Sequence, residues 1–179
     1  NVDGWFEKTK KEAALLAKEE NWDDSAAVQL LFSKAKKEIM QLQKELSTLL
    51  KSLDKAEEDF PEKYATVLQN IMELIGELEE AETYNEYYTI LSRNSVASFP
   101  RATKKDKEWK KYEEVKVFYQ KVKEQISNQK ESVFTAPAEE LQREAALLYP
   151  LLEEYITLAQ RFAEVYFSCK KEKNVYDFD

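Results

Sequence analysis

The sequence is organised around residues 137–173, which read PAEELQREAALLYPLLEEYITLAQRFAEVYFSCKKEK. Its apolar side chains recur at steps of three and four residues, which gathers them along one face of a helix. This apolar stripe consists of Leu141, Ala145, Leu148, Leu152, Tyr155, Leu158, Phe162 and Val165. The pattern predicts one extended helix, broken or kinked at Pro150, that forms the spine on which the other helices pack.

The six residues that follow, Asn174-Val-Tyr-Asp-Phe-Asp179, abandon the helical period. They have the pattern of a strand or a turn, so the chain stops in the middle of an element. We therefore expect residues 1–173 to form a single helical domain. Residues 174–179 are expected to begin a connection back to a larger parent domain.

Upstream of this stretch the sequence predicts further helices, with an irregular segment over residues 94–103. They span roughly residues 5–20, 25–53, a stretch that begins at Pro61, 84–92 and 106–132. The chain has only two glycines and four prolines. Because strand-rich folds need more turn residues, this composition favours long helices with few connections. The sequence thus predicts an all-α fold, an elongated bundle of about five or six helices in long antiparallel pairs, with no significant sheet.

Several residue types on which enzymes commonly depend are missing or rare. The chain has no histidine, which removes the commonest general base and the commonest metal ligand. Its two glycines, Gly4 and Gly76, are too few and too far apart for a phosphate-binding loop. We therefore assign no catalytic residue, no metal site and no cofactor to this chain. One cysteine, Cys169, and the lack of a signal-peptide pattern or a transmembrane run favour the cytoplasm.

The charge is unevenly distributed along the chain. The net charge is −8, yet the segment from Arg93 to Lys130 carries 11 Lys and Arg against 5 Asp and Glu. The candidate DNA-binding residues within it are Arg101, Lys104, Lys105, Lys107, Lys110 and Lys111. Phe99, Trp109 and Tyr112 are interleaved with them. Cations beside an irregular loop can contact phosphates while aromatic rings stack on bases. In the alternative interpretation, the aromatic residues belong to the core and the lysines only solubilise a helix.

Two short motifs resemble superfamily 1 helicases of the UvrD/Rep/RecB group. After the lysine-rich end of the last helix, Val175, Asp177 and Phe178 follow the pattern that leads into the Walker B motif of that group. In the middle of the chain, Phe99-Pro-Arg-Ala-Thr-Lys-Lys105 resembles a turn in the AddA subunit (RexA in some bacteria) of the AddAB helicase–nuclease. The inserted helical region of that subunit looks similar over most of this length.

The resemblance implies that this chain is the 1B arm, an insertion in the first RecA-like motor domain that contacts DNA near the duplex ahead of the fork. The implied parent is an ATP- and Mg²⁺-dependent DNA helicase and exonuclease, a hydrolase. It works with an AddB/RexB partner in double-strand break repair and recombination. The phosphate loop, the Walker B acids and the nuclease carboxylates are absent from this sequence. We therefore expect no ATPase, helicase or nuclease activity from this piece by itself.

Two structural expectations follow from the arm interpretation. The first and last helices should lie close together, so that both ends can re-enter one parent domain. The segment from Phe99 to Lys111 should lie on an exposed face. Binding of the isolated piece to double-stranded or forked DNA should be weak, because a net charge of −8 opposes the approach of phosphates.

Two other interpretations remain open. Long heptad stripes are also typical of a coiled-coil or spectrin-like scaffold that binds other proteins, and an exposed apolar seam that oligomerises would favour it. An independent enzyme is the third interpretation. The absence of histidine and of any recognised catalytic motif counts against it.

Overall fold

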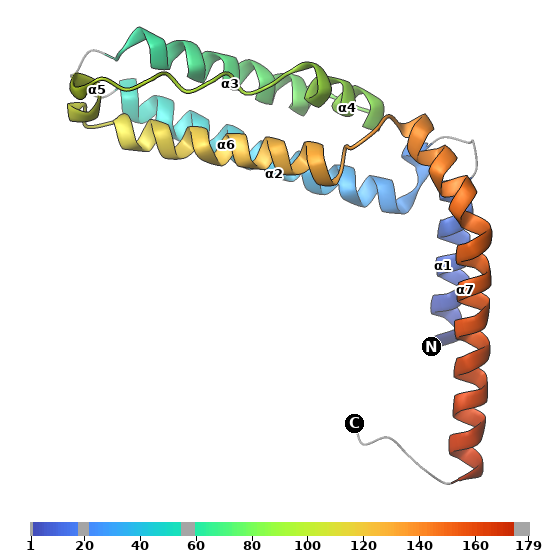
Figure 1. The fold of residues 1–179 in the computed structure, drawn as a ribbon. Helices are drawn as coiled ribbons and strands as arrows, with labels where there is room; N and C mark the ends of the chain where they lie inside the picture. The colour runs from blue at the N-terminus through green and yellow to red at the C-terminus, as the bar shows by residue number, and fades with distance from the viewer. Residues whose placement is uncertain (1, 18–21, 55–59, 174–179) are drawn as a thin grey trace. The chain divides into compact units, whose positions relative to one another are not determined.

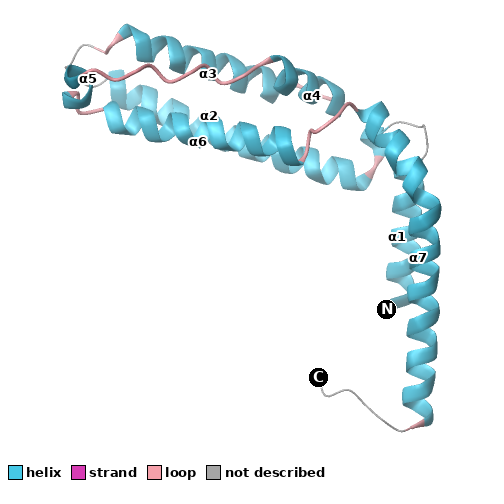
Figure 2. Ribbon diagram, viewed as in Figure 1, coloured by secondary structure: helices cyan, strands magenta, loops and turns pink. Residues whose placement is uncertain are grey.

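The computed structural model describes residues 2–17, 22–54 and 60–173. Within them the elements are α1 Val2–Ala17, a 3₁₀ turn at Trp22–Asp24, α2 Ala26–Asp54, α3 Glu62–Glu80, α4 Tyr84–Arg93, α5 Lys104–Glu108, α6 Tyr112–Ser132 and α7 Ala138–Glu172. These ranges contain no strand, which confirms the predicted all-α fold (Figure 2). None of these helices combines the length and the apolar character needed to cross a membrane.

The chain divides into two compact units. Unit 1 combines the two ends of the sequence, residues 1–27 and 138–179, and unit 2 is the continuous stretch 28–137. The prediction that residues 1–173 act as one inserted domain stays a prediction. The tail motif of Val175, Asp177 and Phe178 lies outside the described residues.

Unit 2 contains the hydrophobic core that the helical periodicity predicts. Its side chains come mainly from one stripe on each of three long helices. The buried positions include Ile39, Leu42 and Leu46 of α2, Leu68, Ile71 and Ile75 of α3, and Val115, Val122 and Ile126 of α6. In Figure 1, α2 runs antiparallel to both α3 and α6. Near-heptad spacing over residues 25–53 also places Leu31 on the buried stripe of α2, but its side chain is 48% exposed.

A buried polar network connects three helices of unit 2. Gln129 of α6 is 4% exposed, and its Oε1 accepts a hydrogen bond of 2.7 Å from the Tyr87 hydroxyl of α4. Its Nε2 donates to Glu38 Oε2 of α2 at 2.9 Å. Because buried polar groups are costly when unpaired, these bonds fix the register of α2, α4 and α6.

Local signals in the sequence set the helix ends around α4. The spacing Thr83-x-x-Glu86 predicts a capping box, and the structure contains it: the Thr83 side chain accepts from the backbone N–H of Glu86, and the Glu86 carboxylate accepts from the backbone N–H of Thr83. Residues 94–103 have no regular structure, as predicted. They return along the bundle from the end of α4 to α5 (Figure 2).

The predicted helix over residues 106–132 is divided in two. α5 ends at Glu108, Trp109 takes an extended conformation with φ −69° and ψ 122°, and α6 begins at Tyr112. Trp109 is buried among aromatic rings contributed by other elements. The burial of this large side chain outweighs the one hydrogen-bonded turn that an uninterrupted helix would gain.

In unit 1, α1 packs along α7 (Figure 1), which confirms that the first and last helices lie close together. α7 continues from Ala138 to Glu172 with Pro150 inside it, so of the predicted break or kink at this proline, the break is wrong. The spine prediction is also wrong. Only Ala138 and Ile156 of α7 are buried, and most of the predicted stripe is exposed to solvent.

Candidate nucleic-acid interface

The predicted basic segment lies at one end of unit 2, where a short helix is held by a capping box. The Thr103 side chain accepts from the backbone N–H of Asp106. In return, Asp106 Oδ2 accepts from the Thr103 backbone N–H at 2.5 Å and from the Thr103 hydroxyl at 2.7 Å. The pattern Thr-x-x-Asp thus sets the first residue of α5 at Lys104, and with it the position of each lysine along the helix.

Asp106 also ties α5 to the first turn of α3. Lys63 Nζ lies 2.5 Å from Asp106 Oδ2. The hydrogen bonds from Lys63 and then from Thr103 favour the charged carboxylate and lower the pKa of Asp106 to about 2. Asp106 is buried, so this cluster is the anchor of α5 and is not a group available to a ligand.

The interleaved aromatic residues form the floor beneath α5. The ring centroid of Tyr64, which is fully buried, lies 5.3 Å from Phe99, 5.9 Å from Trp109 and 5.9 Å from Tyr112. Phe99 in turn lies 4.9 Å from Tyr119. Trp109 and Tyr112 are therefore core residues, as the alternative interpretation of the segment predicted, and their rings do not present a stacking face to bases.

The six candidate cations do not share one environment. The exposed ones are Arg101, Lys104, Lys105, Lys107 and Lys110. Lys111 is half-buried, and its Nζ bonds to Glu114 Oε1 at 2.8 Å. Lys104 and Lys107 are one helical turn apart on α5, with Lys105 beside them. Five exposed positive side chains thus lie on one short, anchored helix or directly beside it, and Lys111 forms an ion pair with Glu114.

Sequence reasoning missed the role of Lys63. This residue lies 43 positions before Asp106, and no local pattern connects the two. The capping box at Thr103 could have been found, since the Thr-x-x-Asp spacing is a readable start signal. Only the folded chain brings the first turn of α3 next to α5.

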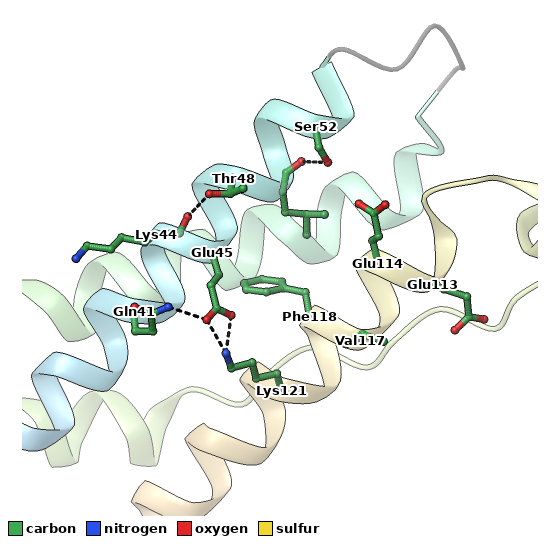
Figure 3. A pocket seen from close by; sticks show the side chains of 11 residues that line it. Gln41, Lys44, Glu45, Thr48, Ser52, Glu113, Glu114, Val117, Phe118 and Lys121 are labelled. Carbon is green, nitrogen blue, oxygen red and sulfur yellow. Dashed lines mark hydrogen bonds and ion pairs between the residues drawn. The ribbon is translucent and has the colours of Figure 1, made fainter.

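A second surface feature of unit 2 is a groove of about 710 Å³ between α2 and α6 (Figure 3). Glu45 and Lys121 bridge it at 2.6 Å, and Gln41 donates to the same Glu45 carboxylate. Leu49, Val117 and Phe118 form its apolar part. The hydrogen bond from Lys121 lowers the pKa of Glu45. This charged pair links two helices, and no group of metal-ligating side chains occurs in the described ranges.

The fold and the site define an all-α protein whose exposed cations gather on a capped helix at one end of a bundle. Comparison with known proteins gives a more particular relationship. The chain is 26% identical over 122 residues to proteins from two strains of Bacillus cereus, each described as the A-type subunit of an ATP-dependent helicase/nuclease. The aligned residues are 67% of this chain and 10% of those proteins, so the chain spans about a tenth of the length of the relatives it matches.

The similarity agrees with the resemblance to AddA-type subunits that the two short motifs indicated. No protein-family model matches the chain, and no solved structure matches it. The comparisons therefore give a similarity to a helicase/nuclease subunit over 122 residues.

Proposed function

We propose that this chain is a DNA-contacting arm, of the 1B type, from an ATP-dependent helicase/nuclease subunit. The observation that carries the proposal is the anchored cationic helix α5, in a chain similar to A-type helicase/nuclease subunits. A second observation supports the proposal. α1 and α7 run side by side, so both ends of the described chain belong to unit 1, which is the arrangement that an insertion in a larger protein requires.

The chemistry of this arm is electrostatic. Lysine and arginine side chains that replace condensed counterions on DNA gain free energy without reading the sequence. The aromatic floor holds α5 in place while the charged side chains reach outward, so contacts go to the phosphate backbone. The expected ligand is double-stranded or forked DNA, bound without preference for base sequence.

In this proposal the reaction takes place in the parent protein, in double-strand break repair and recombination. ATP and Mg²⁺ bind elsewhere in the parent motor, and an AddB/RexB-like subunit completes the nuclease in the cytoplasm. The arm orients DNA relative to the motor. It holds no nucleotide, metal ion or catalytic group of its own.

The proposal is tested by the salt dependence of duplex binding. We expect the Lys104/Lys105/Lys107/Lys110→Gln variant to bind a labelled forked duplex more weakly than the native chain at low salt. The negative slope of log K against log salt concentration should become less steep, by about 0.9 for each phosphate interaction that the variant removes. Fluorescence anisotropy over a salt series measures both quantities.

The matched control is Lys34/Lys37/Lys44/Lys51→Gln, which removes four exposed lysines from α2 and changes the net charge equally. Glutamine has a helix propensity close to that of lysine, so both variants keep their helices. If the two variants lose affinity equally, only the net charge matters and the assignment to α5 is wrong. A native chain whose binding does not depend on salt would also refute it.

A second candidate function, a protein-interaction scaffold, is favoured by one specific observation. The outer face of α7 exposes a row of large apolar side chains over most of its length. A contiguous row of exposed, large apolar side chains on a folded chain usually marks an interaction surface.

A further inference from the structure

The exposed face of α7 has the spacing of a coiled-coil seam. Steps of three and four residues connect Leu148, Leu151, Tyr155, Leu158, Phe162 and Val165, which are between 56% and 70% exposed. This is the a and d pattern of a heptad repeat. Ile156, which is buried, lies about 100° around the helix from Tyr155, on another face. The seam is thus exposed to solvent even though α1 packs along α7.

Two charged residues flank the middle of this seam. In this heptad register, Leu148, Tyr155 and Phe162 are the a residues. Glu154 directly precedes Tyr155 and Arg161 directly precedes Phe162, so the two charged residues occupy equivalent positions in successive heptads. Both are exposed, and neither forms an ion pair within the part of the chain that the structure describes. A groove at the centre of α7 is lined by these two residues together with Leu151, Tyr155 and Leu158.

The charges select the direction of a partner helix. When a second α7 runs antiparallel with Tyr155 opposite Leu158 of the second copy, Leu148 faces Val165 and Leu151 faces Phe162. Glu154 of each copy then meets Arg161 of the other, which makes two equivalent ion pairs about a twofold axis. In a parallel pair, the same two residues would face Ala159 and Tyr166, which carry no charge.

The overall charge of the helix favours the same direction. Residues 138–157 carry five glutamates and one arginine, while residues 158–173 carry four lysines and arginines against two glutamates. An antiparallel pair brings the acidic half of one helix onto the basic half of the other. A parallel pair would place like charges together along the whole seam.

From this seam and these charges, we propose that α7 is a homodimerisation surface, on which a second copy of this chain docks antiparallel through Leu148, Leu151, Tyr155, Leu158, Phe162 and Val165. The proposal does not depend on DNA binding, which involves α5 in the other unit. Its failure would leave the DNA proposal untouched, and the converse also holds.

Sedimentation velocity of the full chain over a wide range of concentrations tests association. The native chain should pass from monomer to dimer, and Leu158→Lys should weaken the dimer by about a hundredfold or more, because a seam position becomes charged. The control Glu164→Arg changes an exposed residue outside the seam and should leave the dimer unchanged. A native chain that stays monomeric would overturn the proposal and leave the seam to a different partner.

Charge reversal tests the direction. Glu154→Arg and Arg161→Glu should each weaken the dimer roughly tenfold, and the double variant Glu154→Arg/Arg161→Glu should recover most of the native affinity, since both interchain pairs are restored with reversed sign. Far-UV circular dichroism confirms that each single variant keeps its helices. The antiparallel pairing would be refuted if the double variant lost as much dimerisation free energy as the two single variants together.

Cys169 provides an independent test, because it is exposed and lies in register with the seam. In the antiparallel arrangement it faces position 144 of the second copy. Mild oxidation should therefore cross-link Glu144→Cys into a covalent dimer, while the native chain and Glu144→Cys/Cys169→Ser should stay uncross-linked. A disulfide dimer of the native chain would indicate a parallel pair and overturn the proposal.

Discussion

The residue that organises the cationic end of unit 2 is an acid. Asp106 completes the capping box of the helix that carries the lysines, bonds to Lys63 of α3 and is buried. A carboxylate surrounded by donors is held in its charged form, so its pKa lies below the ordinary 3.8. The basic surface is therefore built on a buried negative charge.

This arrangement makes the stability of unit 2 depend on acid. Because the pKa of Asp106 is about 2 in the folded chain and ordinarily 3.8, the stabilisation is fully present above about pH 4 and is lost as the pH falls towards 2. Asp106→Asn should lower the free energy of unfolding at neutral pH, and the difference from the native chain should shrink over this window. Urea unfolding at a series of pH values measures it. A difference that stays constant from pH 5 to about pH 2 would show that Asp106 is not the group responsible.

Among the helices, α7 departs most from what its sequence predicts. Its proline lies inside a continuous helix, where it removes one backbone donor and crowds the preceding turn. Its apolar stripe is regular, but regularity alone does not reveal what covers it. By contrast, α2, α3 and α6 have equally regular stripes and bury them against one another.

We expect Pro150→Ala to stabilise unit 1, because alanine restores the missing hydrogen bond to the carbonyl of Ala146. The gain should approach about 3 kcal/mol, the usual difference between proline and alanine within a helix. Thermal unfolding followed by circular dichroism measures it. Ser168→Ala, at an exposed position of the same helix, is the control and should gain only about 0.5 kcal/mol or less from propensity. Equal melting temperatures for Pro150→Ala and the native chain would mean that the helix does not use that bond.

Taken whole, the chain distributes its core unequally. The large buried side chains belong almost entirely to unit 2, whereas unit 1 buries few, Phe6 and Ile156 among them. The free energy needed to open a helix locally follows the apolar area that opening exposes. The two units should therefore differ in local stability even though both are helical.

Hydrogen exchange with mass spectrometry tests this difference. At concentrations low enough to keep the chain monomeric, peptides from α7 should exchange much faster than peptides from α2, α3 and α6. Raising the protein concentration should then protect residues 148–165 selectively if a second copy covers the seam. Protection of α7 equal to that of α2 in the monomer would contradict the unequal core.

The fold class, the approximate ends of α2 and α4, and the buried stripes of α2, α3 and α6 can be read from the amino-acid sequence alone. Helical periodicity and capping patterns are local, so they can be read without knowing the neighbours. The sequence also located the exposed cations around Lys104. Three features become visible only in the folded chain: Trp109 divides a helix, Lys63 bonds to Asp106, and the apolar stripe of α7 is exposed. Each of these depends on which surfaces meet in the folded chain, and a regular apolar stripe does not carry that information.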